Sequence, residues 1–130
     1  MFRENWQPGP ENATRARQWI DQLYRHNHGS LEDILAGHKD FAWLSIEVNY
    51  GLFLSDHRVL DGVETEIVVL SGLLAQRAKR ELAWHLRGTR RIGVSCAEVE
   101  TIQQAIEKVA SYCGVDVKDL PRVSSVEQEV

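Results

Sequence analysis

Apolar residues recur at intervals of three or four along most of the chain, and this spacing constrains the fold more than any other feature of the sequence. Such spacing lines one face of a helix, whereas a half-buried strand needs apolar and polar residues in alternation. No alternating run is long enough to build a sheet. We therefore expect an all-α fold, a single small helical domain over residues 1–130 with about six helices.

Start and stop signals bound the expected helices. Two of them open with a capping box, at Asp61 and at Ser95, in which that side chain caps free amides and a glutamate three residues later reaches back. A strand is the alternative around residues 48–54, which are rich in aromatic side chains, but Gly51 and the length of the segment favour a helix. The expected helices cover residues 11–25, 30–36, 41–54, 63–75, 80–91 and 96–113.

Residues 63–75 are apolar on most sides, which predicts a buried helix that is too short to cross a membrane. With residues 80–91 they would form a central helix hairpin. We expect the core of the domain within residues 41–115. The tail, residues 116–130, contains Pro121 and then a polar run, and we expect a short docking segment followed by a loose end.

Composition excludes several classes of protein. The chain is 43% hydrophobic and 26% charged with a formal net charge of −4, so we expect neither a nucleic-acid partner nor a membrane partner. Its start is polar and lacks the apolar core of a signal peptide, which favours a cytoplasmic protein. Cys96 and Cys113 have neither a redox-pair nor a zinc-site spacing, and we expect both to be structural thiols, Cys113 on an apolar helix face.

One histidine has a setting suited to chemistry. His85 follows Glu81 by one helical turn and adjoins Trp84, so a carboxylate shares its helix face and can fix its tautomer. A solvated pair on the surface is the alternative. Glu66 is a lone acid among apolar residues, and in an antiparallel hairpin it could face His85. Its alternative role is a first-turn carboxylate that favours the helix dipole.

Four short segments, in order and in register, resemble the carboxymuconolactone decarboxylase family, which also contains the alkylhydroperoxidases. Residues 60–67 are similar to its "L-D-x-K-T-R-(E/S)-L", and residues 81–87 to its "E-L-x-x-H-L-R". Residues 92–99 and 111–115 resemble two further motifs of the family. The resemblance implies an all-helical fold that assembles as a homotrimer or a ring-shaped homohexamer, with residues 41–54 and 63–75 partly between subunits.

Departures from the family pattern narrow the chemistry. The two cysteines of the peroxidase branch would fall at Ala78 and Glu81, so a thiol–disulfide mechanism is excluded. The arginine that suits a substrate carboxylate in the decarboxylase branch is Thr65 here. Arg58 lies near the place of another family arginine, and Tyr50 replaces a tryptophan. These departures therefore leave the identity of the substrate undetermined.

The resemblance implies a cofactor-free lyase or isomerase that acts on a small lactone, β-keto or related carbonyl acid, with or without loss of carbon dioxide. His85 would transfer the proton, Glu81 would orient or tune it, and Glu66 would be a second acid or base. The substrate-binding candidates are Arg58, Arg80, Arg87, Trp84 and Tyr50.

Two other classes of function stay open. A non-catalytic oligomeric protein that binds a small ligand is favoured by the lost arginine at Thr65 and opposed by the retained Glu66, Glu81 and His85. A metal-dependent enzyme could use the same three side chains as ligands, although nothing beyond ligand chemistry supports it. The leading interpretation requires no metal and no cofactor.

Overall fold

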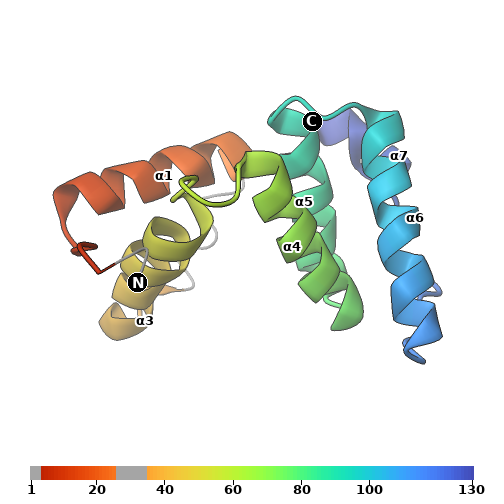
Figure 1. Ribbon diagram of the computed structural model, residues 1–130, viewed down its shortest axis with the longest axis horizontal. Coiled ribbons are helices and arrows are strands. Elements are labelled where there is room, and N and C mark those ends of the chain that lie inside the picture. The colour runs from red at the N-terminus through yellow and green to blue at the C-terminus, as the bar shows by residue number, and fades with distance from the viewer. Residues whose placement is uncertain (1–3, 26–34) are drawn as a thin grey trace. The chain divides into compact units, whose positions relative to one another are not determined.

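The computed structural model describes residues 4–25 and 35–130 (Figure 1). All regular structure in these residues is helical, which confirms the all-α prediction. Most of the short helix expected at residues 30–36 lies outside the described residues. The chain divides into two compact units, residues 1–62 and residues 63–130. That they form one domain stays a prediction.

In the first unit, α1 (Pro10–Tyr24) packs along a π-helix, η2 (Leu44–Leu54), which continues α3 (Lys39–Trp43). Proline suits the first turn of α1, where its missing N–H is not needed. The buried face of α1 carries the residues at helical spacing, which include Ala16, Trp19, Ile20, Leu23 and Tyr24. Because α3 and η2 together cover residues 41–54, the prediction that this segment is helical is confirmed.

The π-helical register of η2 was not expected. Its hydrogen bonds reach five residues back, as from the Ser55 N–H to the Tyr50 carbonyl at 2.8 Å. Gly51 lies against Asn12 of α1, and a Cβ there would be 2.7 Å from the Asn12 amide carbon. Glycine at position 51 thus allows α1 and η2 to approach closely.

The second unit contains α4 (Gly62–Ala75), α5 (Lys79–Arg91) and α6 (Cys96–Tyr112), followed by the short α7 (Val123–Val126) and the 3₁₀ turn η3 (Glu127–Glu129). The expected hairpin of α4 and α5 is present, with the two helices side by side (Figure 1). At the start of α6 the predicted capping box is confirmed: Glu98 accepts from the Ser95 N–H and the Ser95 hydroxyl accepts from the Glu98 N–H.

The prediction that α4 is buried on most sides was wrong for the single chain. Its buried residues are Thr65, Glu66, Leu70 and Leu74, whereas Val68 is 59% exposed. The reason is geometric, because a hairpin partner covers one face of a helix and leaves the opposite face uncovered.

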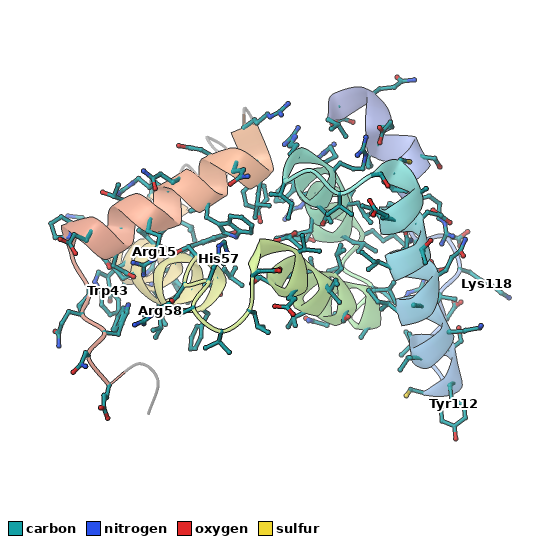
Figure 2. The ribbon with its side chains drawn as sticks, turned by 45° about the horizontal axis from the view of Figure 1, so that its top comes forward. Arg15, Trp43, His57, Arg58, Tyr112 and Lys118 are labelled. Carbon is teal, nitrogen blue, oxygen red and sulfur yellow. The ribbon has the colours of Figure 1, made fainter. Side chains whose placement is uncertain are left out.

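The apolar face of α6 is likewise buried only in part. Val99 and Ala110 join the core, but Val109 and Cys113 are exposed and Cys96 is half-buried. Figure 2 shows the neighbouring Tyr112 at the free end of this helix, pointing away from it. The expectation that Cys113 is buried was therefore wrong: Ala110 marks the covered side of the last turn of α6, and Cys113 is exposed.

The tail docks on the second unit, as expected for its first part, and its end, which was expected to be loose, is ordered as well. Leu120, Val123 and Val126 belong to the core of the second unit, together with Leu82 and Leu86 of α5. The polar residues of the tail form ion pairs with arginines of α5, which accounts for its ordered end. Among the described residues, no helix has both the length and the apolar character that a membrane span requires.

Candidate acid–base site

Glu66 and His85 form a buried pair inside the hairpin. The Nδ1 atom of His85 lies 2.8 Å from Oε2 of Glu66, and their side chains are 7% and 0% exposed. Glu66 shares its face of α4 with Leu70, and His85 shares its face of α5 with Leu82, so core packing positions both groups. The first-turn dipole role considered for Glu66 is therefore not its main role.

Thr89, one turn after His85 on α5, completes the cluster and was missed in the sequence. Its hydroxyl donates to the His85 carbonyl at 2.7 Å and lies 3.4 Å from Oε2 of Glu66. The second carboxylate oxygen, Oε1 of Glu66, is buried without a hydrogen-bond partner in the structure. A buried acceptor without a donor is costly, so Oε1 is a place where a donor group of a ligand or water would be stabilised.

Glu81 has a different partner from the one expected. Its carboxylate accepts from Nε and Nη2 of Arg80 at 2.9 and 2.7 Å. These hydrogen bonds lower the pKa of Glu81 more than any other cause, followed by a bond to its own backbone, and the charge of His85 contributes least. The side chain that directly orients the His85 ring is therefore Glu66, and Glu81 acts on His85 only through its charge.

Arg80 and Trp84 lie together at the start of α5. The guanidinium carbon of Arg80 is 5.1 Å from the centre of the Trp84 ring, and the Arg80 side chain is 66% exposed. This arrangement is a cation–π contact at the surface. It leaves Arg80 as the substrate-binding candidate of α5 that solvent reaches most easily.

Arg87 does not share the His85 site. Two residues along a helix point to nearly opposite faces, and the Arg87 guanidinium is buried and pairs with the Glu129 carboxylate. The assignment of Arg87 to substrate binding is therefore not supported by its position. Spacing alone could have revealed this, because Thr89 rather than Arg87 shares the face of His85.

Arg58 and Tyr50 belong to the first unit. Arg58 donates from Nε and Nη2 to the two carboxylate oxygens of Asp56, each at 2.7 Å, and these bonds raise the pKa of Arg58. Tyr50 is buried, with its hydroxyl 2.8 Å from that of Tyr24. Both candidates thus have partners within their own unit.

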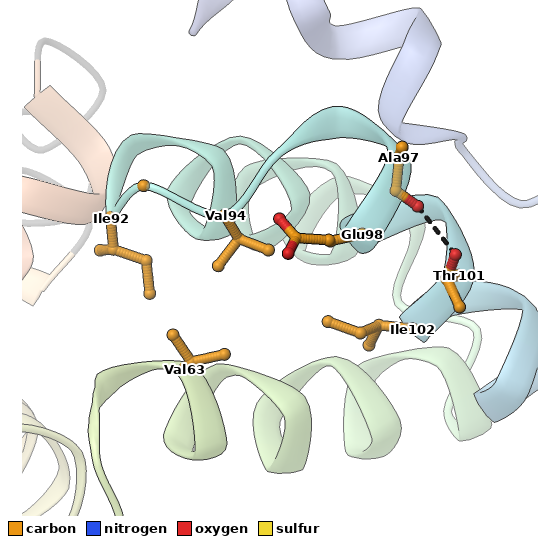
Figure 3. A pocket seen from close by; sticks show the side chains of 8 residues that line it. Val63, Ile92, Val94, Ala97, Glu98, Thr101 and Ile102 are labelled. Atoms are coloured by element: carbon orange, nitrogen blue, oxygen red, sulfur yellow. Dashed lines mark hydrogen bonds between the residues drawn. The ribbon is translucent and has the colours of Figure 1, made fainter.

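An apolar cleft of about 610 Å³ lies in the second unit between the start of α4, the loop after α5 and the start of α6 (Figure 3). Val63, Val94 and Ile102 contribute apolar side chains, and the Glu98 carboxylate projects between them. The hydroxyl and backbone N–H of Ser95 lower the pKa of Glu98, which therefore stays ionised as part of the helix cap.

The three side chains that the metal-dependent alternative would use do not converge. Glu66 binds His85, whereas Glu81 binds Arg80. Across residues 4–25 and 35–130 the structure contains no cluster of three or more His, Cys, Asp or Glu side chains arranged to hold a metal ion. The metal-dependent alternative therefore has no support in the geometry.

Comparison with family models, with curated proteins and with solved structures gave no match. The resemblance to the carboxymuconolactone decarboxylase family consequently stays a prediction based on its four motifs.

Proposed function

We propose that the protein is a cofactor-free lyase or isomerase that acts on a small lactone, β-keto or related carbonyl acid by proton transfer at His85. The observation that carries this proposal is the buried hydrogen bond between His85 Nδ1 and Glu66 Oε2. A carboxylate at Nδ1 keeps the proton on that nitrogen and leaves the lone pair on Nε2, which is the arrangement a general base needs.

The proposed chemistry is acid–base catalysis. Removal of a proton next to a carbonyl group, or loss of carbon dioxide from such an acid, leaves an enolate that must be protonated again. His85 would move that proton, and Glu66 would orient the imidazole and stabilise its charged form. Arg80 is the favoured group for the substrate carboxylate, because its guanidinium is exposed and a second carboxylate can compete with Glu81 for it.

The proposal is tested by screening lactone acids and β-keto acids with the wild-type protein, while carbon dioxide release and isomer formation are measured. For any substrate found, His85→Gln should fold and lose on the order of 10²-fold in rate. Activity of this variant equal to wild type would remove the proposal.

The alternative is a non-catalytic member of the same oligomeric scaffold that binds a small ligand. The observation in its favour is the near-complete burial of Glu66 and His85, which a purely structural pair would also show. A ligand that raises the melting temperature of the wild-type and His85→Gln proteins equally, without turnover, would favour this alternative.

We also propose that the chain assembles with itself, as a homotrimer or a ring-shaped homohexamer, in the cytoplasm. Large apolar side chains stay exposed on both helices expected at subunit contacts: Phe41, Trp43, Leu44 and Phe53 in the first unit and Val68 on α4. Apolar groups of this size in solvent favour a covered interface.

A further inference from the structure

A polar pocket of about 760 Å³ lies within the first unit, and the proposed acid–base chemistry does not use it. The segment before α1, the first turns of α1 and the segment after η2 form its wall. Figure 2 shows Arg15, His57 and Arg58 gathered in this region. The sequence singled out Arg58 alone, because nothing in its pattern connects the two segments.

Arg15 contributes a guanidinium that lacks a carboxylate partner among the described residues. Its Nη2 atom donates to Oδ1 of Asn12 at 2.7 Å and to the Gly51 carbonyl at 2.8 Å, and both acceptors are neutral. Its Nε atom is buried and has no hydrogen-bond partner. The positive charge of Arg15 is therefore held in place without a direct counter-charge.

A buried network fixes the position of Arg15. The side-chain amide of Asn12 donates to the Glu47 carboxylate at 2.6 Å and to the Glu47 carbonyl at 2.9 Å. The indole N–H of Trp6 donates to Asn12 Oδ1 at 3.0 Å, the same atom that accepts from Arg15. With both ends of Asn12 held, Arg15 is oriented before any ligand arrives, which lowers the cost of binding.

Arg58 supplies a second guanidinium on the same wall. Asp56 is buried and occupies the Nε and Nη2 side of Arg58, while the Arg58 side chain is 64% exposed and keeps further donors. The His57 ring packs edge-on against Trp19, with centroids 4.6 Å apart, and its Nε2 atom lies 3.2 Å from the Leu54 carbonyl, so its position is restricted. The wall also contains the Glu11 carboxylate, which is exposed to solvent.

We propose that this pocket binds a small oxyanion, a carboxylate or a phosphate, through the guanidinium groups of Arg15 and Arg58. Guanidinium groups bind both kinds of oxyanion through charge-assisted hydrogen bonds. Asp56 already has its counter-charge in Arg58, so the ligand would chiefly compensate Arg15. The site is independent of His85, and its test does not depend on turnover.

The first test is a titration of the ¹⁵N-labelled wild-type protein with phosphate, with acetate and with chloride, followed by NMR. The Trp6 indole signal and the Arg15 Nε–H signal should shift saturably with phosphate, with acetate or with both, and the preferred anion identifies tetrahedral or planar recognition. The indole signal of Trp43, which lies outside the pocket, is the internal control. No saturable shift up to about 20 mM, or an equal shift with chloride, would overturn the proposal.

The second test uses variants. Arg15→Gln should weaken binding by about tenfold, the usual worth of one charge-assisted hydrogen bond. Arg17→Gln, an exposed position on the same helix, should bind like wild type. Because Arg15 also supports the Gly51 carbonyl, Arg58→Lys serves as the second variant, since it keeps the charge and loses the planar fork. If both variants fold and bind as tightly as wild type, the pocket is not an oxyanion site.

Discussion

Arg90 donates to both carboxylate oxygens of Glu127, from Nε to Oε2 at 2.9 Å and from Nη2 to Oε1 at 2.6 Å. This bidentate pair joins the end of the chain to α5, beside the pair of Arg87 with Glu129. The hydrogen bonds from Arg90 are the main cause of a pKa of Glu127 below its ordinary value of 4.5.

The first prediction concerns acid. A carboxyl whose folded-state pKa is lowered stabilises the fold above its unfolded pKa, and this contribution is lost as the pH falls through the folded value. As the pH falls below about 4.5 we therefore expect the attachment of η3 and the end of α7 to α5 to weaken, while Val123 and Val126 stay packed in the core. Amide hydrogen exchange in η3, relative to Val99 in the core, measures this loss. Glu127→Gln should show weakened protection already at neutral pH, and identical protection in both proteins at pH 7 and pH 3 would contradict the prediction.

The second prediction ranks the two carboxylates near His85 by the loss of rate that their substitution causes. Glu66→Gln should lower the rate on any identified substrate more than Glu81→Gln, because Glu66 contacts the imidazole and Glu81 binds Arg80. The ¹⁵N chemical shifts of the His85 ring report its tautomer, and they should change in Glu66→Gln and stay constant in Glu81→Gln. The reverse order in both measurements would return the orienting role to Glu81.

The third prediction concerns assembly. Val68→Asp and Phe53→Asp each place a charge on an exposed apolar position and should convert the oligomer into a monomer. Lys108→Asp, at an exposed polar position of α6, is the matched control and should leave the assembly intact. Light scattering gives the mass directly, and a wild-type monomer at micromolar concentration would contradict the proposed assembly.

The fourth prediction concerns the π-helix. Gly51→Ala forces a methyl group into the Asn12 side chain and should lower the free energy of unfolding by about 1–3 kcal/mol, as overpacking does elsewhere. Gly37→Ala is the control, because nothing lies within 4 Å of a Cβ there, and its effect should be below about 0.5 kcal/mol. Chemical denaturation compares the two variants, and equal stabilities would show that Asn12 and η2 are not in tight contact.

The fifth prediction concerns the thiols. Cys113 is exposed and Cys96 half-buried, so a thiol reagent should label Cys113 first. Neither belongs to the Glu66–His85 cluster, and the double Cys→Ala variant should keep its activity. A folded double variant that has lost turnover would mean that the proposed acid–base mechanism is wrong.

Local signals in the sequence predicted most of the helices. The capping box at Ser95 and the apolar spacing that follows it depend only on neighbours along the chain, so both can be identified without knowledge of the fold. The π-register of η2 was not predicted, and the close approach of Asn12 to Gly51 comes from another helix, so no local pattern reveals that contact. The ordered end of the tail was not predicted, because Glu127 and Glu129 pair with arginines that lie far away in the sequence.

The part of the candidate site that could be predicted is the part that follows from the α4–α5 hairpin. An antiparallel arrangement of α4 and α5 was enough to place Glu66 opposite His85. The partners of the arginines were not predictable in the same way, since they come from distant parts of the chain, as Glu129 does for Arg87. The sequence did not indicate that Thr89 belongs to the site. A threonine inside a helix commonly bonds its own backbone, and only the facing carboxylate of Glu66 makes it part of a site.

Helix α5 keeps two sets of side chains on separate faces, His85 and Thr89 toward Glu66, and Arg87 and Arg90 toward the end of the chain. Substitutions on one face should therefore be nearly additive with those on the other, as for sites that share no partner. A protein engineer could vary the last residues to tune solubility or attach a reporter while selecting independently for new chemistry at His85. The same separation would let natural sequences drift at the carboxyl end without a matching change in the acid–base pair.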